Sequence, residues 1–150
     1  MNIQVWTDTD LHGAGSALLL KWLYKDADNF SIQDVSESTL TGRFKGALHT
    51  LGHYDRVYIA DLDLTSEQVH LVDKENVVVI DTHRNHAANK HLYKKAKVII
   101  DSDIYSSVSL IYNKFKSHLS DLTTEQINLI KCIESYDWYN AENKDSLKLN

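Results

Sequence analysis

Proline is absent from this chain of 150 residues, and cysteine occurs only once, at Cys132. A single cysteine excludes an internal disulfide framework and a cysteine-rich zinc cluster, and it favours a reducing, cytoplasmic setting. The apolar runs are short, as at residues 17–20, and none is long enough to form a membrane-spanning helix. We therefore expect a cytoplasmic globular protein with no membrane partner.

Basic residues are also scarce, because 16 Lys and Arg stand against 21 Asp and Glu, and the formal net charge is −5. Proteins that bind long duplex nucleic acid usually neutralise its phosphates with a basic surface, so such a partner is not expected. Eight histidines accompany the acids. An excess of carboxylates and imidazoles over cations points to a divalent metal ion.

Short β-branched runs alternate with helical patterns along the chain. The runs predict strands over residues 3–6, 30–35, 56–60, 76–80 and 97–100. Apolar spacing and capping boxes predict helices after residue 13 and over 40–51, 65–72, 108–119 and from 123 onward. This alternation predicts an α/β fold, a doubly wound, mostly parallel five-stranded sheet with helices on both faces. Residues 1–139 form the predicted domain, and residues 140–150 form a polar C-terminal tail.

Aspartates follow four of the five predicted strands. They are Asp8, Asp10, Asp61, Asp63, Asp81 and Asp101. Ligands of open α/β sheets bind outside the carboxyl ends of the strands, so these acids should meet at one edge. Helix N-capping explains any one of them alone. Several together favour a shared cation, because clustered carboxylates repel one another and are costly to desolvate.

Four segments resemble motifs of the DHH phosphoesterase superfamily, which includes RecJ-like exonucleases, nano-RNases and cyclic-dinucleotide phosphodiesterases. Residues 8–17 (DTDLHGAGSA) resemble the first motif, and residues 60–63 (ADLD) resemble the second. Residues 79–83 (VIDTH) resemble the Asp-His-His motif that names the superfamily, and residues 135–138 (SYDW) resemble the stretch with the last metal aspartate. The resemblance covers essentially the whole chain. It implies a metal-dependent phosphoesterase that hydrolyses a small nucleotide substrate, either a short oligonucleotide or a cyclic dinucleotide.

The resemblance also implies one or two Mn²⁺ (or Mg²⁺) ions and a ligand set. Asp8, Asp10 and Asp61 would hold the first ion, and Asp61 would be shared with a second ion on His12 and Asp137. Asp137 has independent support, since it follows Ile130 and Ile133 at helical spacing and so shares their predicted buried face.

The remaining implied roles concern the phosphate. His83 matches the second histidine of the Asp-His-His motif and would act as an acid or hydrogen-bond donor at the phosphoryl group. Arg84 and His86, which follow it, would add substrate-binding contacts.

Two departures from the family pattern support an alternative. Thr82 stands in place of the first histidine of the motif, and His12 stands where an aspartate is usual. No C-terminal cap domain is seen either, so we expect a fragment, a reduced protein, or a substrate site that another subunit closes, as in a homodimer. The alternative is a degenerate, non-catalytic DHH-like domain that binds a nucleotide or a protein.

Two other classes also fit parts of the pattern. Asp8 and Asp10 could supply the nucleophile and acid of a haloacid-dehalogenase-like phosphatase, although His12 stands where that family has a hydroxyl residue. A receiver-like signalling domain fits less well, because it needs a lysine after the fifth strand and Lys97 opens that strand.

Overall fold

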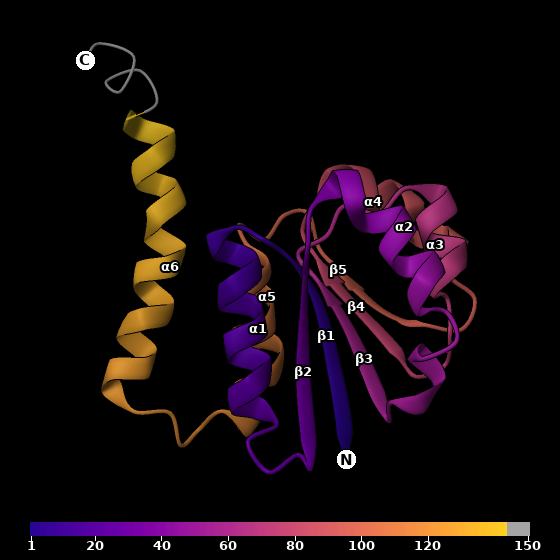
Figure 1. Ribbon diagram of the computed structural model, residues 1–150. Helices are drawn as coiled ribbons and strands as arrows, with labels where there is room; N and C mark the ends of the chain where they lie inside the picture. Colours follow the sequence, from indigo (N-terminus) through magenta and orange to yellow (C-terminus); the bar gives the residue numbers. More distant parts are fainter. Residues whose placement is uncertain (144–150) are drawn as a thin grey trace.

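The computed structural model describes the backbone of residues 1–143 and the side chains of residues 1–136. A parallel five-stranded sheet, in the order β2-β1-β3-β4-β5, carries helices on both faces (Figure 1). The strands are β1 (Asn2–Asp8), β2 (Asn29–Val35), β3 (Arg56–Ala60), β4 (Val77–Asp81) and β5 (Lys97–Ile100). The helices are α1 (Leu11–Leu23), α2 (Glu37–Ala47), α3 (Ser66–Val72), α4 (Arg84–Asn89), α5 (Ser107–Phe115) and α6 (Thr124–Asn143). Short 3₁₀ turns are η1 (Leu51–His53), η2 (Lys90–Leu92) and η3 (Lys116–His118). The predicted doubly wound α/β fold is confirmed.

The strand order creates a switch point between β1 and β3. The chain leaves β1 through α1 to reach β2 on one side, and it returns through α2 to β3 on the other side of β1. Thr7 pairs with Ala60 at the carboxyl ends of these two strands. Open α/β sheets bind ligands in the crevice at such a point, so the residues that follow Thr7 and Ala60 are placed for function.

Alternating strand residues feed two hydrophobic cores, one on each face of the sheet. Ile3 and Val5 of β1 pack with the core under α1, α5 and α6. Trp6, with Val57 and Ile59 of β3, packs with the core under α2 and α3. The two-residue period of a strand explains this division, because consecutive side chains point to opposite faces. Both faces are buried, which accounts for the nearly continuous apolar runs in β3 and β4.

Several helix boundaries differ from those predicted. Helix α1 ends at Leu23, so the apolar residues Tyr24 and Ala27 lie beyond it. Helix α5 ends at Phe115 and is followed by the 3₁₀ turn η3, although the predicted helix continued to residue 119. Helix α6 extends past the predicted domain boundary at residue 139. Helix α4 was not predicted, because its six residues bury only His86 and present no apolar stripe.

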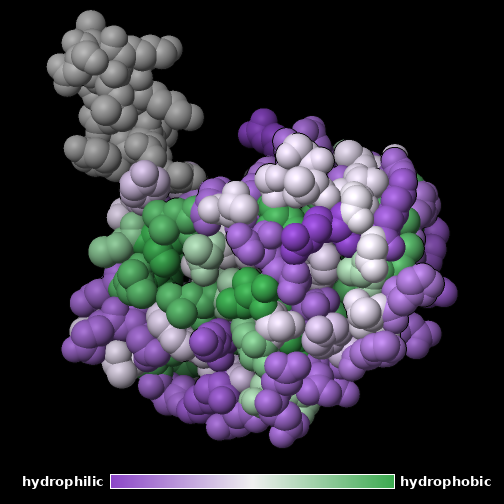
Figure 2. Space-filling view, in the orientation of Figure 1, coloured by the Kyte–Doolittle hydropathy of each residue, from purple (hydrophilic) through white to green (hydrophobic). Residues whose placement is uncertain are grey.

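The outer surface is mainly hydrophilic, with hydrophobic area on the side of α1 and α6 (Figure 2). Leu11 of α1, Ile32 of β2 and Leu129 of α6 are among the large hydrophobic residues that are exposed. Within the described part of the chain, no helix combines the length and apolar character that a membrane crossing requires.

Candidate functional site

A cavity of about 370 Å³ opens at the carboxyl edge of the sheet, beside the switch point. Seven residues line it: Asp10, His12, Asp61, Thr82, His83, Arg84 and Tyr105. Five of them were predicted site residues, and they arrive from three separate β–α connections. The strand-end argument predicted Asp10 and Asp61 among them, and the family resemblance pointed to His12, His83 and Arg84.

Asp61 is the first residue after β3, and its side chain is deeply buried, with 5% of the residue exposed. Its backbone has a φ of 59°, and its N–H donates to the Ile80 carbonyl at 3.1 Å. A left-handed conformation costs a residue with a Cβ roughly 1–2 kcal/mol, although aspartate tolerates it better than most. Strain of this kind is retained where the surrounding structure requires a side chain in one place.

The electrostatic surroundings of Asp61 disfavour its charged form. Burial raises the pKa of the Asp61 carboxyl to about 6, and the negative charges of Asp10 and Asp81 add to the effect. The Ser107 hydroxyl and His12 act in the opposite direction without cancelling it. A divalent cation would relieve this unfavourable charge, so the donor set fits a hard metal ion.

Asp81, the last residue of β4, is completely buried and anchors two histidines. One carboxylate oxygen accepts a hydrogen bond from Nδ1 of His83 at 2.8 Å, and the other accepts from Nδ1 of His86 at 2.7 Å. Burial favours the neutral acid, but these two hydrogen bonds outweigh it and hold the pKa of Asp81 below its usual value. Asp81 is therefore a carboxylate at neutral pH.

His86 has no exposed surface and does not line the cavity, although the sequence predicts it as a substrate contact. Its Nδ1–H is committed to Asp81, and its Nε2 lies 2.6 Å from the Tyr93 hydroxyl. A neutral imidazole satisfies both bonds, because Nδ1 donates and Nε2 accepts the Tyr93 proton. In this structure His86 fixes the position of Asp81.

His83 has a half-exposed side chain that lines the cavity. Its hydrogen bond to Asp81 raises the pKa of the imidazole to about 9, and the nearby charges of Asp61 and Asp63 contribute further. Burial opposes this shift but does not overcome it. At neutral pH His83 is therefore a cationic donor, which suits a contact with a phosphoryl oxygen.

Asp61, Asp81 and His83 form a compact group of donor atoms. One ligand-type atom from each lies within 4.8 Å of the others. Carboxylate oxygens suit Mg²⁺ and Mn²⁺, and imidazole is a further ligand for Mn²⁺. Asp81 was absent from the predicted metal ligands. The available signal was its place at the end of a buried strand, two residues before His83.

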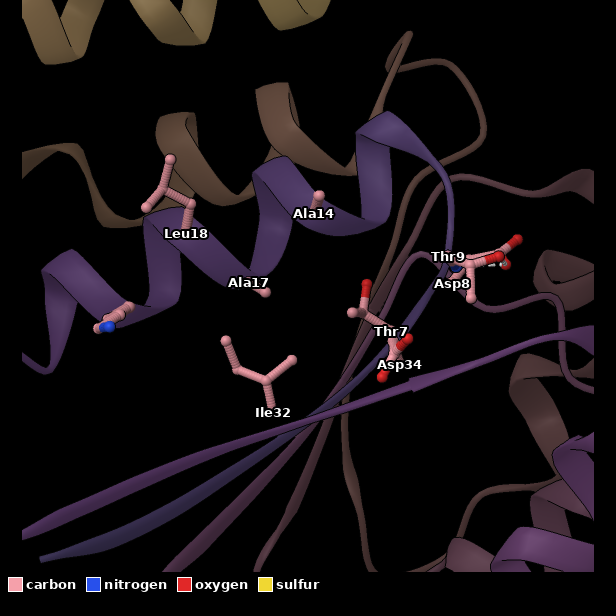
Figure 3. Close-up of a pocket in the computed structure, with 9 residues that line it drawn as sticks. Thr7, Asp8, Thr9, Ala14, Ala17, Leu18, Ile32 and Asp34 are labelled. Carbon is pink, nitrogen blue, oxygen red and sulfur yellow. Dashed lines mark hydrogen bonds between the residues drawn. The ribbon is translucent and has the colours of Figure 1, made fainter.

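The structure places the remaining predicted metal ligands in different surroundings. Asp10 lines the cavity and also caps α1, since its Oδ1 accepts the Gly13 N–H at 2.8 Å. Asp8 instead lines a neighbouring groove of about 480 Å³ between α1 and the edge strand β2, where it lies nearer to Asp34 than to Ile32 (Figure 3). The backbone of Asp137 belongs to α6, but its side chain lies outside the described residues.

Gly13 allows the β1–α1 connection to turn tightly at the cavity. A Cβ on Gly13 would lie 2.2 Å from the carbonyl oxygen of Asp8 and 2.7 Å from Oγ1 of Thr7. Glycine is therefore required at this position of the first motif, because any side chain would collide with the protein's own backbone. A Cβ on Gly15, two residues further, would lie 3.0 Å from side-chain atoms of Ile133 in α6 and Val108 in α5, so the absence of a side chain there lets these helices pack.

Comparisons with known proteins support the fold. No family model matches the chain, and no curated protein sequence matches it. An uncharacterized protein from Helicobacter pylori G27 has a similar structure, with a TM-score of 0.69 and 13% identity, covering 94% of this chain and 44% of that one. CDC45 from Entamoeba histolytica is also similar, with a TM-score of 0.62 and 21% identity, covering 86% of this chain and 28% of that one. The chain thus spans less than half the length of either protein, and at these identities the likeness shows the fold alone.

Proposed function

We propose that this protein is a metal-dependent phosphoesterase that hydrolyses a phosphodiester in a small nucleotide, such as a short oligonucleotide or a cyclic dinucleotide. The close grouping of two carboxylates, Asp61 and Asp81, with the His83 imidazole beside the switch-point cavity carries the proposal, because it places candidate metal ligands next to a hydrogen-bond donor for a phosphoryl oxygen. The resemblance of four segments to DHH phosphoesterase motifs supports it. The acidic net charge suits a small substrate held by metal better than a long duplex.

The residues around the cavity divide into two groups. Asp61, Asp81 and Asp10 would hold one or two Mn²⁺ or Mg²⁺ ions, and we propose Asp61 as the shared ligand. Such an ion lowers the pKa of a bound water and stabilises charge on phosphoryl oxygens. The cationic ring of His83 donates to a phosphoryl or leaving-group oxygen, and the Arg84 guanidinium offers a second donor from the first turn of α4.

A second candidate function is binding without catalysis, as in a degenerate DHH-like domain that holds a nucleotide or a protein. Thr82 favours it, because its side chain lines the cavity where the family has a metal-binding histidine. A threonine hydroxyl is a poor ligand for Mn²⁺ compared with imidazole. Either function is compatible with the cytoplasmic setting that the single cysteine favours.

Calorimetric titration with Mn²⁺, together with a phosphodiesterase assay on dinucleotides, tests both candidates. We expect wild-type protein to bind Mn²⁺ and turn over the dinucleotide, and we expect Asp61→Asn to abolish turnover. Asp63→Asn is the matched control, since Asp63 lies on the same loop but lines another cavity and accepts a hydrogen bond from Asn85. Mn²⁺ binding without turnover would favour the second candidate. The absence of both would contradict the phosphoesterase.

A further inference from the structure

Tyr105 stands between the candidate metal site and a second cavity. It lies in the connection from β5 to α5, and 48% of the residue is exposed. Its side chain lines the cavity of Asp10 and Asp61 and also an adjoining cavity of about 350 Å³ between α5 and α6. A ligand anchored beside Asp61 can therefore extend across Tyr105 into the second cavity.

The ring of Tyr105 has a defined orientation. It meets the imidazole of His12 edge to face, with centroids 6.3 Å apart and planes at 81°. His12 is buried near the start of α1, so one side of the tyrosine ring packs against a buried residue of the protein. An oriented, half-exposed aromatic ring beside a phosphate site is the arrangement that proteins use to stack a nucleobase.

The second cavity carries polar groups that match the edge of a base. Its lining besides Tyr105 consists of Ser109, Lys131, Glu134 and Ser135. The Ser109 hydroxyl donates to Glu134, which fixes the carboxylate beside the cavity. A carboxylate accepts from the amino groups of adenine, cytosine or guanine, and a lysine ammonium donates to ring nitrogens or carbonyl oxygens.

We propose that Tyr105 is the stacking platform for the base of the bound nucleotide, and that Glu134 and Lys131 read the edge of that base. The inference rests on the proposed function, because it needs the phosphate to occupy the cavity of Asp61. It adds a specificity-determining residue outside the four segments with family resemblance. The ligand class is a nucleotide whose base carries an exocyclic amino group.

Fluorescence of 2-aminopurine riboside 5′-monophosphate tests the stacking, because this base is quenched when it stacks on an aromatic ring. Titrations use the full chain with Mg²⁺, and calorimetry with ribose 5-phosphate provides the ligand without a base. We expect Tyr105→Ala to weaken binding of the probe by about 5- to 150-fold and to abolish the quenching. We expect Tyr105→Phe to retain both, and Tyr105→Leu to lose the quenching. Tyr136→Ala is the matched control, since Tyr136 is 50% exposed and lines neither cavity.

Three binding results would each overturn the stacking role. These are unchanged probe binding by Tyr105→Ala, equal losses for the probe and ribose 5-phosphate, and no binding of the probe by wild-type protein. Turnover of a dinucleotide is measured separately. Full turnover by Tyr105→Ala with unchanged KM refutes the stacking role and leaves the phosphoesterase intact. Base-dependent binding without any turnover refutes the phosphoesterase and leaves the stacking role intact.

Discussion

Nδ1 of His83 donates to Oδ1 of Asp81 at 2.8 Å, and this bond joins a half-exposed ring to a fully buried carboxylate. It is the main reason that the pKa of His83 rises to about 9. The second oxygen of Asp81 is occupied by His86, so the carboxylate cannot turn away from His83. The buried Asp81 carboxylate therefore fixes the position of His83, the proton donor that lines the cavity.

Replacement of His83 tests its role as that donor. We expect His83→Gln to lower kcat for a dinucleotide by about 10²- to 10³-fold, because a cationic donor to the phosphoryl group is lost. Stability should fall less than in a variant without a donor at this position, because the amide of Gln can still donate to the buried Asp81 carboxylate. His70→Gln, at an exposed histidine on α3, serves as the control. An unchanged kcat in His83→Gln would remove His83 from the reaction.

The hydrogen-bonded pair of His86 and Tyr93 predicts a graded loss of stability. His86→Phe leaves one oxygen of the buried Asp81 carboxylate without its donor, so we expect the free energy of unfolding to fall by about 2–4 kcal/mol. Tyr93→Phe removes only the bond to Nε2 of His86 and should cost about 0.5–1.5 kcal/mol. Urea unfolding in EDTA at pH 7 measures both. Equal stability of His86→Phe and wild type would contradict the anchoring role.

Local sequence signals predicted the fold well because they act at short range. Thr65 and Gln68 form the predicted capping box at the start of α3, and Thr123 and Gln126 make the same reciprocal bonds before α6. Strand periodicity located all five strands to within a few residues. Helix α4 escaped prediction, because a short helix built around a buried polar histidine carries no apolar period.

The site was predicted less completely than the fold, because side-chain direction depends on tertiary contacts. Strand-end position correctly brought Asp10 and Asp61 to one cavity, but it gave no direction for Asp8, which lines the groove beside β2. His86 supports Asp81 and does not line the cavity because it is buried and hydrogen-bonded to both Asp81 and the Tyr93 hydroxyl. Neither effect is encoded in spacing along the chain.

Gly13 predicts a steric effect on the β1–α1 connection. In Gly13→Ala the new Cβ would overlap the Asp8 carbonyl, so the loop and the Asp10 cap must shift. We expect a loss of about 1–3 kcal/mol in the free energy of unfolding, together with weaker Mn²⁺ binding. Gly42→Ala is the matched control, because nothing lies within 4 Å of its added Cβ in α2. It should raise stability by about 0.5–1 kcal/mol. If Gly13→Ala and Gly42→Ala changed the free energy of unfolding by the same amount, the close approach at Gly13 would be contradicted.

Asp73 predicts a pH-dependent contribution to stability far from the candidate site. Its carboxylate accepts the N–H groups of Lys94, Lys95 and Ala96 at 2.8–2.9 Å, which ties the end of α3 to the approach to β5. Burial raises the pKa of Asp73, but these three bonds outweigh it and hold the pKa below the ordinary value of 3.8. The charged form is therefore favoured more in the folded state than in the unfolded state.

A depressed carboxyl pKa makes the stabilisation fully present above about pH 5 and lost as pH falls through the folded-state pKa. We expect Asp73→Ala to lower the free energy of unfolding by about 1–2 kcal/mol at pH 7, a value reduced by solvent screening at this partly exposed site. The difference from wild type should shrink steadily below pH 4. Urea unfolding at pH 7, 5, 3.5 and 2.5 measures it, with Asp26→Ala as an exposed control. A difference that is as large at pH 2.5 as at pH 7 would show that the three bonds do not depend on the charge of Asp73.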